Sequence, residues 1–192
     1  MTSLPQSEVE IKFVVPDIPT LEGKLRSAGF HVETPRTHEL NTLYDFPDQQ
    51  LRRRGELLRL RQYGPTWTLT HKAPGQRGIH KSRIETETRV ADGENLHAIL
   101  LALGLKPGFR YEKFRAEWSD GRGHVVIDQT PIGNLAEIEG EPDWIERTAK
   151  ELGVSREQYI TQNYADLFRD WKKRTRSPAE EMTFAATGTP AS

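Results

Sequence analysis

Charged and apolar residues alternate one by one along several short segments of this chain, and that period of two strongly constrains the fold. Within residues 8–13, Glu8, Glu10 and Lys12 occupy every second position and apolar residues fill the others. Successive side chains of a β-strand point to opposite faces, so each such segment predicts a strand with one charged face and one apolar face. Eight segments are predicted as strands: residues 8–13, 39–46, 57–62, 67–72, 83–90, 113–118, 125–128 and 136–139. Turn-sized gaps between most of them imply antiparallel neighbours.

Four other segments have the apolar spacing of helices. Residues 17–28 and 92–103 each begin at an aspartate and are each followed by a glycine, which are typical start and stop signals. Residues 143–152 and 156–171 begin with capping-box pairs. The remaining residues, 172–192, lack periodic apolar positions and are rich in small and polar residues. We therefore expect one α+β domain over residues 1–171 and a disordered C-terminal tail over residues 172–192.

The charged faces are unusual as a set. A single strand of this kind is most often the solvated face of an ordinary sheet, but here nearly every selected position carries a charge. The seven cations are Lys12, Arg59, Arg61, Lys72, Arg83, Lys113 and Arg115, and the seven anions are Glu8, Glu10, Glu85, Glu87, Asp128, Glu137 and Glu139. This set favours an eight-stranded antiparallel β-barrel with a charged lumen, whose apolar outer faces are covered by about four helices. Because buried unpaired charge costs several kcal/mol per ion, such a tunnel requires water, pairing or a charged ligand.

The balance of charges in the lumen indicates which ligand it would take. A triphosphate carries about four negative charges and could engage roughly five to seven cations. The carboxylates would repel it unless a divalent cation bridged them to the phosphate oxygens. Oxygen ligands without cysteine suit Mg²⁺ or Mn²⁺. We therefore expect a small triphosphate as substrate and Mg²⁺ or Mn²⁺ as cofactor.

Composition excludes several other classes of function. The chain has no cysteine, which rules out thiolate nucleophiles and cysteine-ligated metals, and its six histidines show no zinc-ligand spacing. With 27 basic and 28 acidic residues, the formal net charge of −1 argues against a nucleic-acid binder. The N-terminus lacks the features of a signal peptide, and the longest apolar run, 99–105, is about a third of a membrane span. A cytoplasmic location without membrane contact is the expectation.

The charged positions also resemble a known family. Glu8-x-Glu10-x-Lys12 is similar to the ExExK signature of the CYTH superfamily, the triphosphate tunnel metalloenzymes, which include class IV adenylate cyclases, thiamine triphosphatases and inorganic triphosphatases. ExExK alone is a weak signal, but further matches follow in order over residues 8–168. They are Tyr44-Asp45, Leu57-Leu58-Arg59-Leu60-Arg61, Leu69-Thr70-His71-Lys72, Arg83-Ile84-Glu85, Tyr111-Glu112-Lys113-Phe114-Arg115, Asp128, Ala136-Glu137-Ile138-Glu139-Gly140 and Tyr164-Ala165-Asp166-Leu167.

The resemblance implies a role for each group of charges. The seven cations would bind the triphosphate, and Glu8, Glu10, Asp128, Glu137 and Glu139 would surround one or two metal ions. Lys12, Lys72 and Glu85 are the candidate catalytic residues. Glu85 and Glu87 could hold a second metal or the attacking water, or simply pair with arginines of the lumen, and pairing is the favoured interpretation.

Three functions remain open at this point. The preferred hypothesis is metal-dependent hydrolysis of the terminal phosphate of tripolyphosphate, ATP or thiamine triphosphate. The alternative is a class IV adenylate cyclase, although no His-Phe pair precedes the ExExK segment as it does in some cyclase members. A third hypothesis, a module that binds polyphosphate or nucleotide without turnover, would not need the full acidic set. Self-association into a homodimer is compatible with all three.

Overall fold

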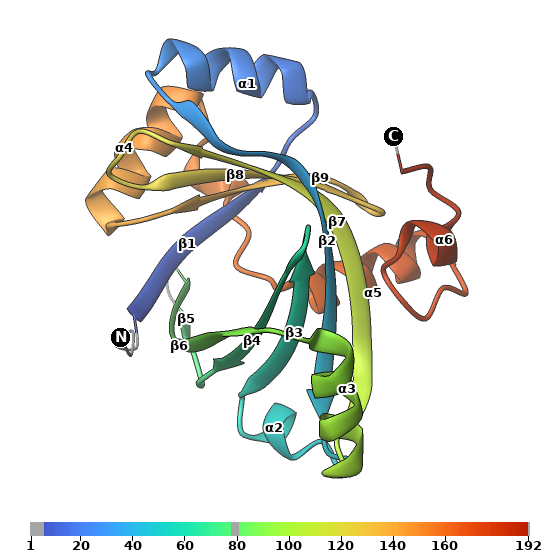
Figure 1. Ribbon diagram of the computed structural model, residues 1–192. Coiled ribbons are helices and arrows are strands. Elements are labelled where there is room, and N and C mark those ends of the chain that lie inside the picture. Colours follow the sequence, from blue (N-terminus) through green and yellow to red (C-terminus); the bar gives the residue numbers. More distant parts are fainter. Residues whose placement is uncertain (1–5, 78–80, 192) are drawn as a thin grey trace.

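The computed structural model describes residues 6–77 and 81–191, and a single large sheet dominates it (Figure 1). The strands are β1 (Gln6–Val14), β2 (His31–Asp45), β3 (Leu57–Tyr63), β4 (Thr66–Lys72), β5 (Gln76–Arg77), β6 (Lys81–Val90), β7 (Lys106–Ser119), β8 (His124–Thr130) and β9 (Gly133–Glu139). All paired strands are antiparallel. The eight-stranded antiparallel sheet is thus confirmed, with the two-residue β5 as an addition beside β6.

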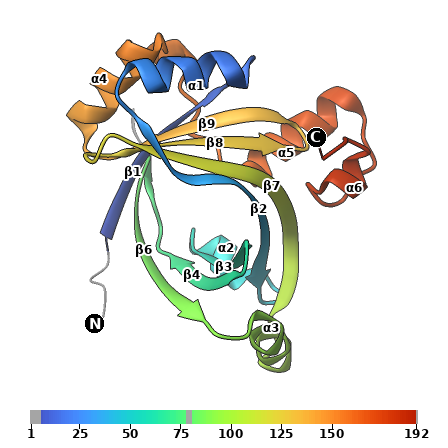
Figure 2. The ribbon, with the colours of Figure 1, turned by 45° about the horizontal axis from the view of Figure 1, so that its top comes forward.

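The sheet curls around a shared interior, as Figure 2 shows. Its strand order is β1-β9-β8-β7-β2-β3-β4-β6-β5, and β1 also pairs with β6. The first half of β1 pairs with β6, from Gln6↔Glu85 to Glu10↔Lys81, whereas its second half pairs with β9, from Glu10↔Glu139 to Val14↔Leu135. The two edges of the sheet, β6 and β9, are therefore joined through β1, and each pairs with only part of that strand. The result is an incompletely closed barrel and not a continuous tunnel wall.

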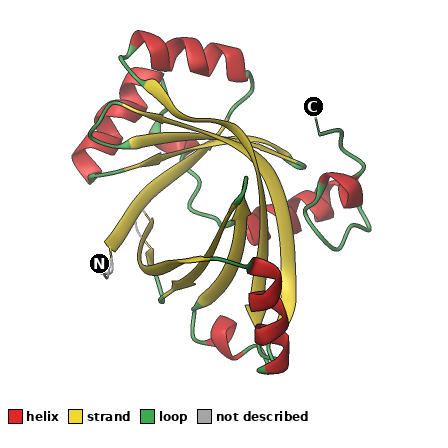
Figure 3. Cartoon of the chain, viewed as in Figure 1, coloured by secondary structure: helices red, strands yellow, loops and turns green. Residues whose placement is uncertain are grey.

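Helices lie outside this sheet (Figure 3). They are α1 (Ile18–Ser27), α2 (Gln50–Arg53), α3 (Gly93–Ala102), α4 (Pro142–Leu152), the 3₁₀ turn η1 (Arg156–Gln158), α5 (Tyr164–Thr175) and α6 (Phe184–Thr187). The predicted aspartate caps are present, since Asp17 accepts from the Thr20 N–H and Asp92 from the Asn95 N–H, both at 2.9 Å. Among the described residues, no helix is both long and apolar enough to cross a membrane.

The helix expected over residues 156–171 is interrupted. The predicted capping box of Ser155 and Gln158 forms, but it caps only η1. The chain is then extended, and the Ile160 N–H donates to the Lys12 carbonyl at 2.7 Å. Asn163 caps a new helix, α5, by accepting from the Asp166 N–H at 2.9 Å. This extended stretch carries the chain past β1 before α5 begins.

The apolar faces of the strands are covered where the helices lie. The largest core cluster joins the outer faces of β1, β8 and β9 to α1 and α4, with Ile11, Ile138 and Ile145 at most 1% exposed. A second cluster places α3 over β3 and β4, where Trp67 lies against Gly93. A Cβ at Gly93 would come within 2.0 Å of the Trp67 ring, so only glycine permits this approach. The apolar faces thus point outward and leave the charged faces for the interior.

The C-terminal segment packs on the body in this structure, whereas the sequence analysis expects a disordered tail over residues 172–192. The helix α5 continues to Thr175, and Met182 is fully buried. The Met182 N–H donates to the Arg110 carbonyl, and the Glu112 N–H donates to the Met182 carbonyl, both at 3.0 Å. Met182 and Ala179 pack with Phe168 in an apolar cluster. The tail has few apolar residues, but these two are enough to hold it against the body. The single-domain assignment over residues 1–171 stays a prediction.

Candidate functional site

The interior of the curled sheet is a cavity of about 1200 Å³. Six of the seven predicted cations line it, from four different strands. They are Lys12 on β1, Arg59 and Arg61 on β3, Lys72 on β4, and Lys113 and Arg115 on β7. The side chain of the seventh, Arg83, lies outside the described part of the structure. Alternation along each strand therefore placed these six side chains correctly.

Three predicted acidic residues come together on one wall of this cavity. Glu10, Glu137 and Glu139 each offer a carboxylate oxygen, and these oxygens lie within 4.8 Å of one another. The pairing of β1 with β9 causes this, because Glu10 is opposite Glu139 and Lys12 is opposite Glu137. Three converging carboxylates fit Mg²⁺ or Mn²⁺, which prefer oxygen ligands. The side chain of Glu8 lies outside the described residues.

Glu137 connects the three carboxylates to the cations. Its Oε1 lies 2.6 Å from Lys12 Nζ, and its Oε2 lies 2.5 Å from Arg115 Nη2. Burial alone would lower the pKa of Lys12, but the carboxylates of Glu137 and Glu10 outweigh it and raise that pKa above its ordinary value. Burial likewise opposes ionisation of Glu137, whose pKa the Lys12 and Arg115 charges nevertheless hold well below its usual range. Both groups are therefore charged at neutral pH.

Asp128, also predicted as a metal ligand, lies among cations in this structure. It is fully buried and sits opposite Arg115 in the pairing of β7 with β8. Its Oδ2 is 2.9 Å from Lys113 Nζ and 2.6 Å from Arg115 Nη2. The three-carboxylate group defined by the 4.8 Å spacing does not include it. Asp128 thus anchors two of the predicted phosphate-binding side chains here.

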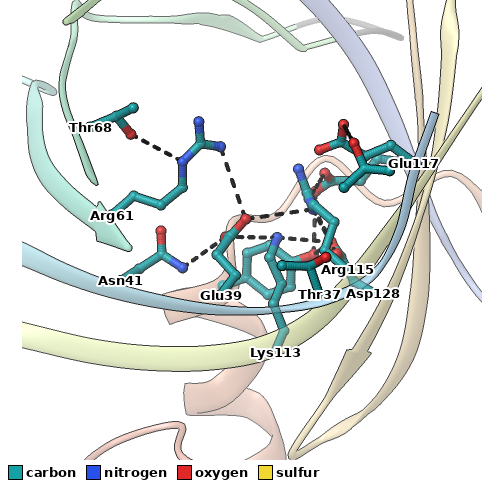
Figure 4. A network of polar contacts seen from close by, with 12 residues as sticks. Thr37, Glu39, Asn41, Arg61, Thr68, Lys113, Arg115, Glu117 and Asp128 are labelled. Atoms are coloured by element: carbon teal, nitrogen blue, oxygen red, sulfur yellow. Dashed lines mark hydrogen bonds and ion pairs between the residues drawn. The ribbon is translucent and has the colours of Figure 1, made fainter. Parts of the chain in front are cut away.

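A fully buried carboxylate that the sequence analysis missed, Glu39 on β2, lies at the centre of the cations (Figure 4). Its carboxylate oxygens lie 3.4 Å from Lys113 Nζ, 3.9 Å from Arg115 Nε and 4.0 Å from Arg61 Nη1. The amide of the buried Asn41 donates to Glu39 Oε1 at 2.8 Å. Burial alone would raise the pKa of Glu39, but the surrounding cations lower it to about 2. The signal was present, since Glu39 and Asn41 alternate with Leu40 and Thr42.

The two ambiguous glutamates of β6 both pair with cations. Lys72 Nζ and Glu85 Oε1 form an ion pair. Glu87 accepts from the Thr70 hydroxyl at 2.6 Å and from Arg61 Nη2 at 3.3 Å. Glu87 thus pairs with an arginine of the lumen, as the pairing interpretation predicts, whereas the ion pair of Glu85 is with a lysine.

Tyr164 is a second buried contributor, which the sequence analysis names only within the family-like segment Tyr164-Ala165-Asp166-Leu167. Its hydroxyl donates to Asp128 Oδ2 and lies 3.4 Å from Glu137 Oε1. It is the first residue of α5, and the polar end of its ring reaches the buried carboxylates, while later residues of the same helix, such as Asp166 and Arg169, also line the cavity. Helical spacing alone does not reveal which end of a tyrosine is buried against polar groups.

Comparison with known proteins agrees with this geometry. The model of the CYTH domain matches residues 6–164. A candidate adenylate cyclase from Methanocaldococcus jannaschii is 27% identical over 171 residues, covering 83% of this chain and 97% of that protein.

Solved structures share the fold. A candidate adenylate cyclase from Vibrio parahaemolyticus has a TM-score of 0.77 at 20% identity, covering 86% of this chain and 99% of that one. A protein from Hippeastrum, described as an adenylyl cyclase candidate with a dominant triphosphatase activity, has a TM-score of 0.65 at 18% identity, covering 85% and 95%. With the domain model spanning most of its length, this chain belongs to the CYTH family.

Proposed function

We propose that this protein hydrolyses the terminal phosphate of a small triphosphate in a reaction that depends on Mg²⁺ or Mn²⁺. The observation that supports this is the shared cavity, in which six cations lie beside a group of three carboxylates. Glu137 belongs to that group and also contacts Lys12 and Arg115. A phosphate chain on the cations would therefore pass next to the carboxylates that suit a metal.

The charges already present explain why a metal would be needed. Each of the six predicted cations that line the cavity has a carboxylate within 4.0 Å, so none of these six lacks a counter-charge. An added triphosphate would be repelled by those carboxylates. A bound divalent cation would neutralise charge on both the carboxylates and the phosphate oxygens, and would lower the pKa of a bound water. Glu10, Glu137 and Glu139 would hold it, with Glu8 and Asp128 as further candidate ligands.

The side chains of the cavity have distinct roles in this proposal. Phosphoryl transfer needs positioning and charge neutralisation more than covalent chemistry from the protein. Arg59, Arg61, Lys113 and Arg115, together with Arg83, would bind the phosphate chain. Lys12, beside Glu137, would neutralise charge that develops on the transferred group. Lys72 would hold Glu85, which would orient the attacking water.

A class IV adenylate cyclase is the second candidate, because relatives from Methanocaldococcus jannaschii and Vibrio parahaemolyticus are described as adenylate cyclase candidates. A cyclase must fix adenosine at one mouth of the cavity. Four side chains could read a base: Gln62, Tyr63, Trp67 and Gln129. Two of these are committed elsewhere, because Trp67 packs under α3 and Gln129 accepts a hydrogen bond from Arg36. This favours the hydrolase.

Product analysis tests the proposal. Purified protein is incubated with tripolyphosphate, ATP or thiamine triphosphate in Mg²⁺ or Mn²⁺, and the products are separated by chromatography. We expect orthophosphate, ADP as the main ATP product, a higher kcat/KM for tripolyphosphate than for ATP, and no activity in EDTA. Cyclic AMP with equimolar pyrophosphate would establish the cyclase instead. Tight binding of all three without any product would indicate a binding module.

A further inference from the structure

Tyr164 is the only residue of α5 that the described structure places against Asp128 and Glu137. It is 9% exposed, and α5 is anchored at this end by the Asn163 cap. Its hydroxyl donates to Asp128 Oδ2 and lies 3.4 Å from Glu137 Oε1. One donor from outside the sheet is therefore directed at two carboxylates carried by different strands.

The ring of Tyr164 also makes specific contacts. It stacks on Tyr111 with a centroid separation of 5.4 Å. Lys113 Nζ lies 4.7 Å and Lys12 Nζ lies 5.1 Å from the ring centroid, positions that favour cation–π attraction. The tyrosine thus contacts one proposed phosphate-binding lysine, the lysine paired with Glu137, and two carboxylates.

From these contacts we infer that Tyr164 is a positioning residue for the metal site, acting through Glu137 and Asp128. This inference rests on the proposed role of Glu137 as a metal ligand. Glu137 forms ion pairs with Lys12 and Arg115, and Asp128 forms ion pairs with Lys113 and Arg115. A neutral donor between the two carboxylates fixes their orientation without adding a charge that would compete with a metal. Groups that hydrogen-bond to metal ligands orient them, and losing one typically costs about 10–100-fold in metal affinity.

The geometry defines the direction in which the hydroxyl proton points. Asp128 Oδ2 is its acceptor, and Glu137 Oε1 lies 3.4 Å away on the neighbouring strand.

The test is a Mn²⁺ titration followed by electron paramagnetic resonance, without any triphosphate. Tyr164→Phe should bind Mn²⁺ at least about 10-fold more weakly than the parent protein, with circular dichroism showing that it is folded. The matched control is Tyr159→Phe, because Tyr159 lies in a separate hollow beside α4. Replacing Tyr164 with p-aminophenylalanine, which restores an N–H donor on the same ring, should return the affinity close to that of the parent.

The outcomes separate this inference from the proposed function. Unchanged Mn²⁺ affinity in Tyr164→Phe would overturn the inference even if triphosphate hydrolysis is confirmed. If Tyr164→Phe does not fold, loss of affinity in the p-aminophenylalanine variant would overturn it. A third outcome is that Tyr164→Phe, but not Tyr159→Phe, binds Mn²⁺ more weakly while the parent protein cleaves no triphosphate. This result would support the inference and refute the proposed hydrolase.

Discussion

Lys12 Nζ lies 2.6 Å from Glu137 Oε1, and the two side chains are only 4% and 5% exposed. The contact joins a residue proposed to bind phosphate to a residue proposed to bind metal. Neighbouring strands impose it, because Lys12 and Glu137 are directly opposite in the pairing of β1 with β9. A phosphate site that includes Lys12 and a metal site that includes Glu137 would therefore be directly adjacent.

Removing the amine of Lys12 should affect both activity and stability. In Lys12→Ala we expect kcat/KM for the triphosphate to fall by at least about 10-fold, since a charge-assisted contact contributes roughly 1.5–3 kcal/mol. Glu137 would keep Arg115 but lose its other buried partner, so the free energy of unfolding should fall by about 3 kcal/mol. Steady-state kinetics and urea denaturation measure the two effects. Lys150→Ala, on the exposed face of α4, is the control, and equal kinetics in both variants would contradict the shared cavity.

Glu139→Gln tests the group of three carboxylates. The substitution removes one charge from oxygens that lie within 4.8 Å of one another, so it should weaken Mn²⁺ binding and abolish metal-dependent turnover. Repulsion between like charges falls at the same time, so the melting temperature without metal should hold steady or rise. Isothermal titration calorimetry and thermal melting check both, with the exposed Glu151→Gln as control. Turnover by the parent protein in excess EDTA would refute metal dependence.

Glu39 predicts a specific pH dependence of stability. Its pKa is lowered from 4.5 to about 2 in the folded protein, because surrounding cations outweigh the opposing effect of burial. The ionised carboxylate therefore stabilises the fold above pH 4.5, by about 3 kcal/mol, and this contribution is lost as the pH falls through 4.5 toward 2. Glu39→Gln should be less stable than the parent at neutral pH, and denaturation curves should show this difference shrinking in acid. A difference that does not vary with pH would argue against the assignment.

The ordered tail makes Met182 a test of stability that should leave the chemistry intact. Met182 is fully buried against β7, so Met182→Ala should lower the free energy of unfolding by about 2–5 kcal/mol through the cavity it leaves. Turnover per folded molecule should stay the same below the melting transition. Lys173→Ala, exposed on α5, should change neither quantity. Equal stability of the two variants would mean that the tail does not dock on the body in solution.

The face of the sheet to which each side chain points was predictable, because it depends only on the local geometry of a single strand. The period of two placed Lys12, Arg59 and Lys113 in one interior, although they come from three strands far apart in sequence. The same rule placed Trp67 on the outer, packed face, where it lies under α3. These positions required no knowledge of which strands are neighbours.

Glu39 lies at the boundary of a predicted strand, where alternation is a weak signal. It is the first residue of the strand predicted over residues 39–46, whereas β2 begins at His31. The first half of β2 carries few apolar residues and pairs with β7 through bulges, so its alternation is weak. The fully buried carboxylate of Glu39 therefore lies at the end of the predicted strand.

The sequence by itself determined the antiparallel strands, their charged inner faces and the residue types suited to a triphosphate and a metal, because alternation and charge are properties of short segments. Only the tertiary structure decided which of those charges touch. The register of β1 with β9 brings Glu10 to Glu139, and that of β7 with β8 brings Asp128 to Arg115. The position of α5 directs Tyr164 at both groups, and the fold of the tail buries Met182. Such contacts join residues distant in the chain, and their geometry depends on the packing of the whole sheet, which no single segment encodes.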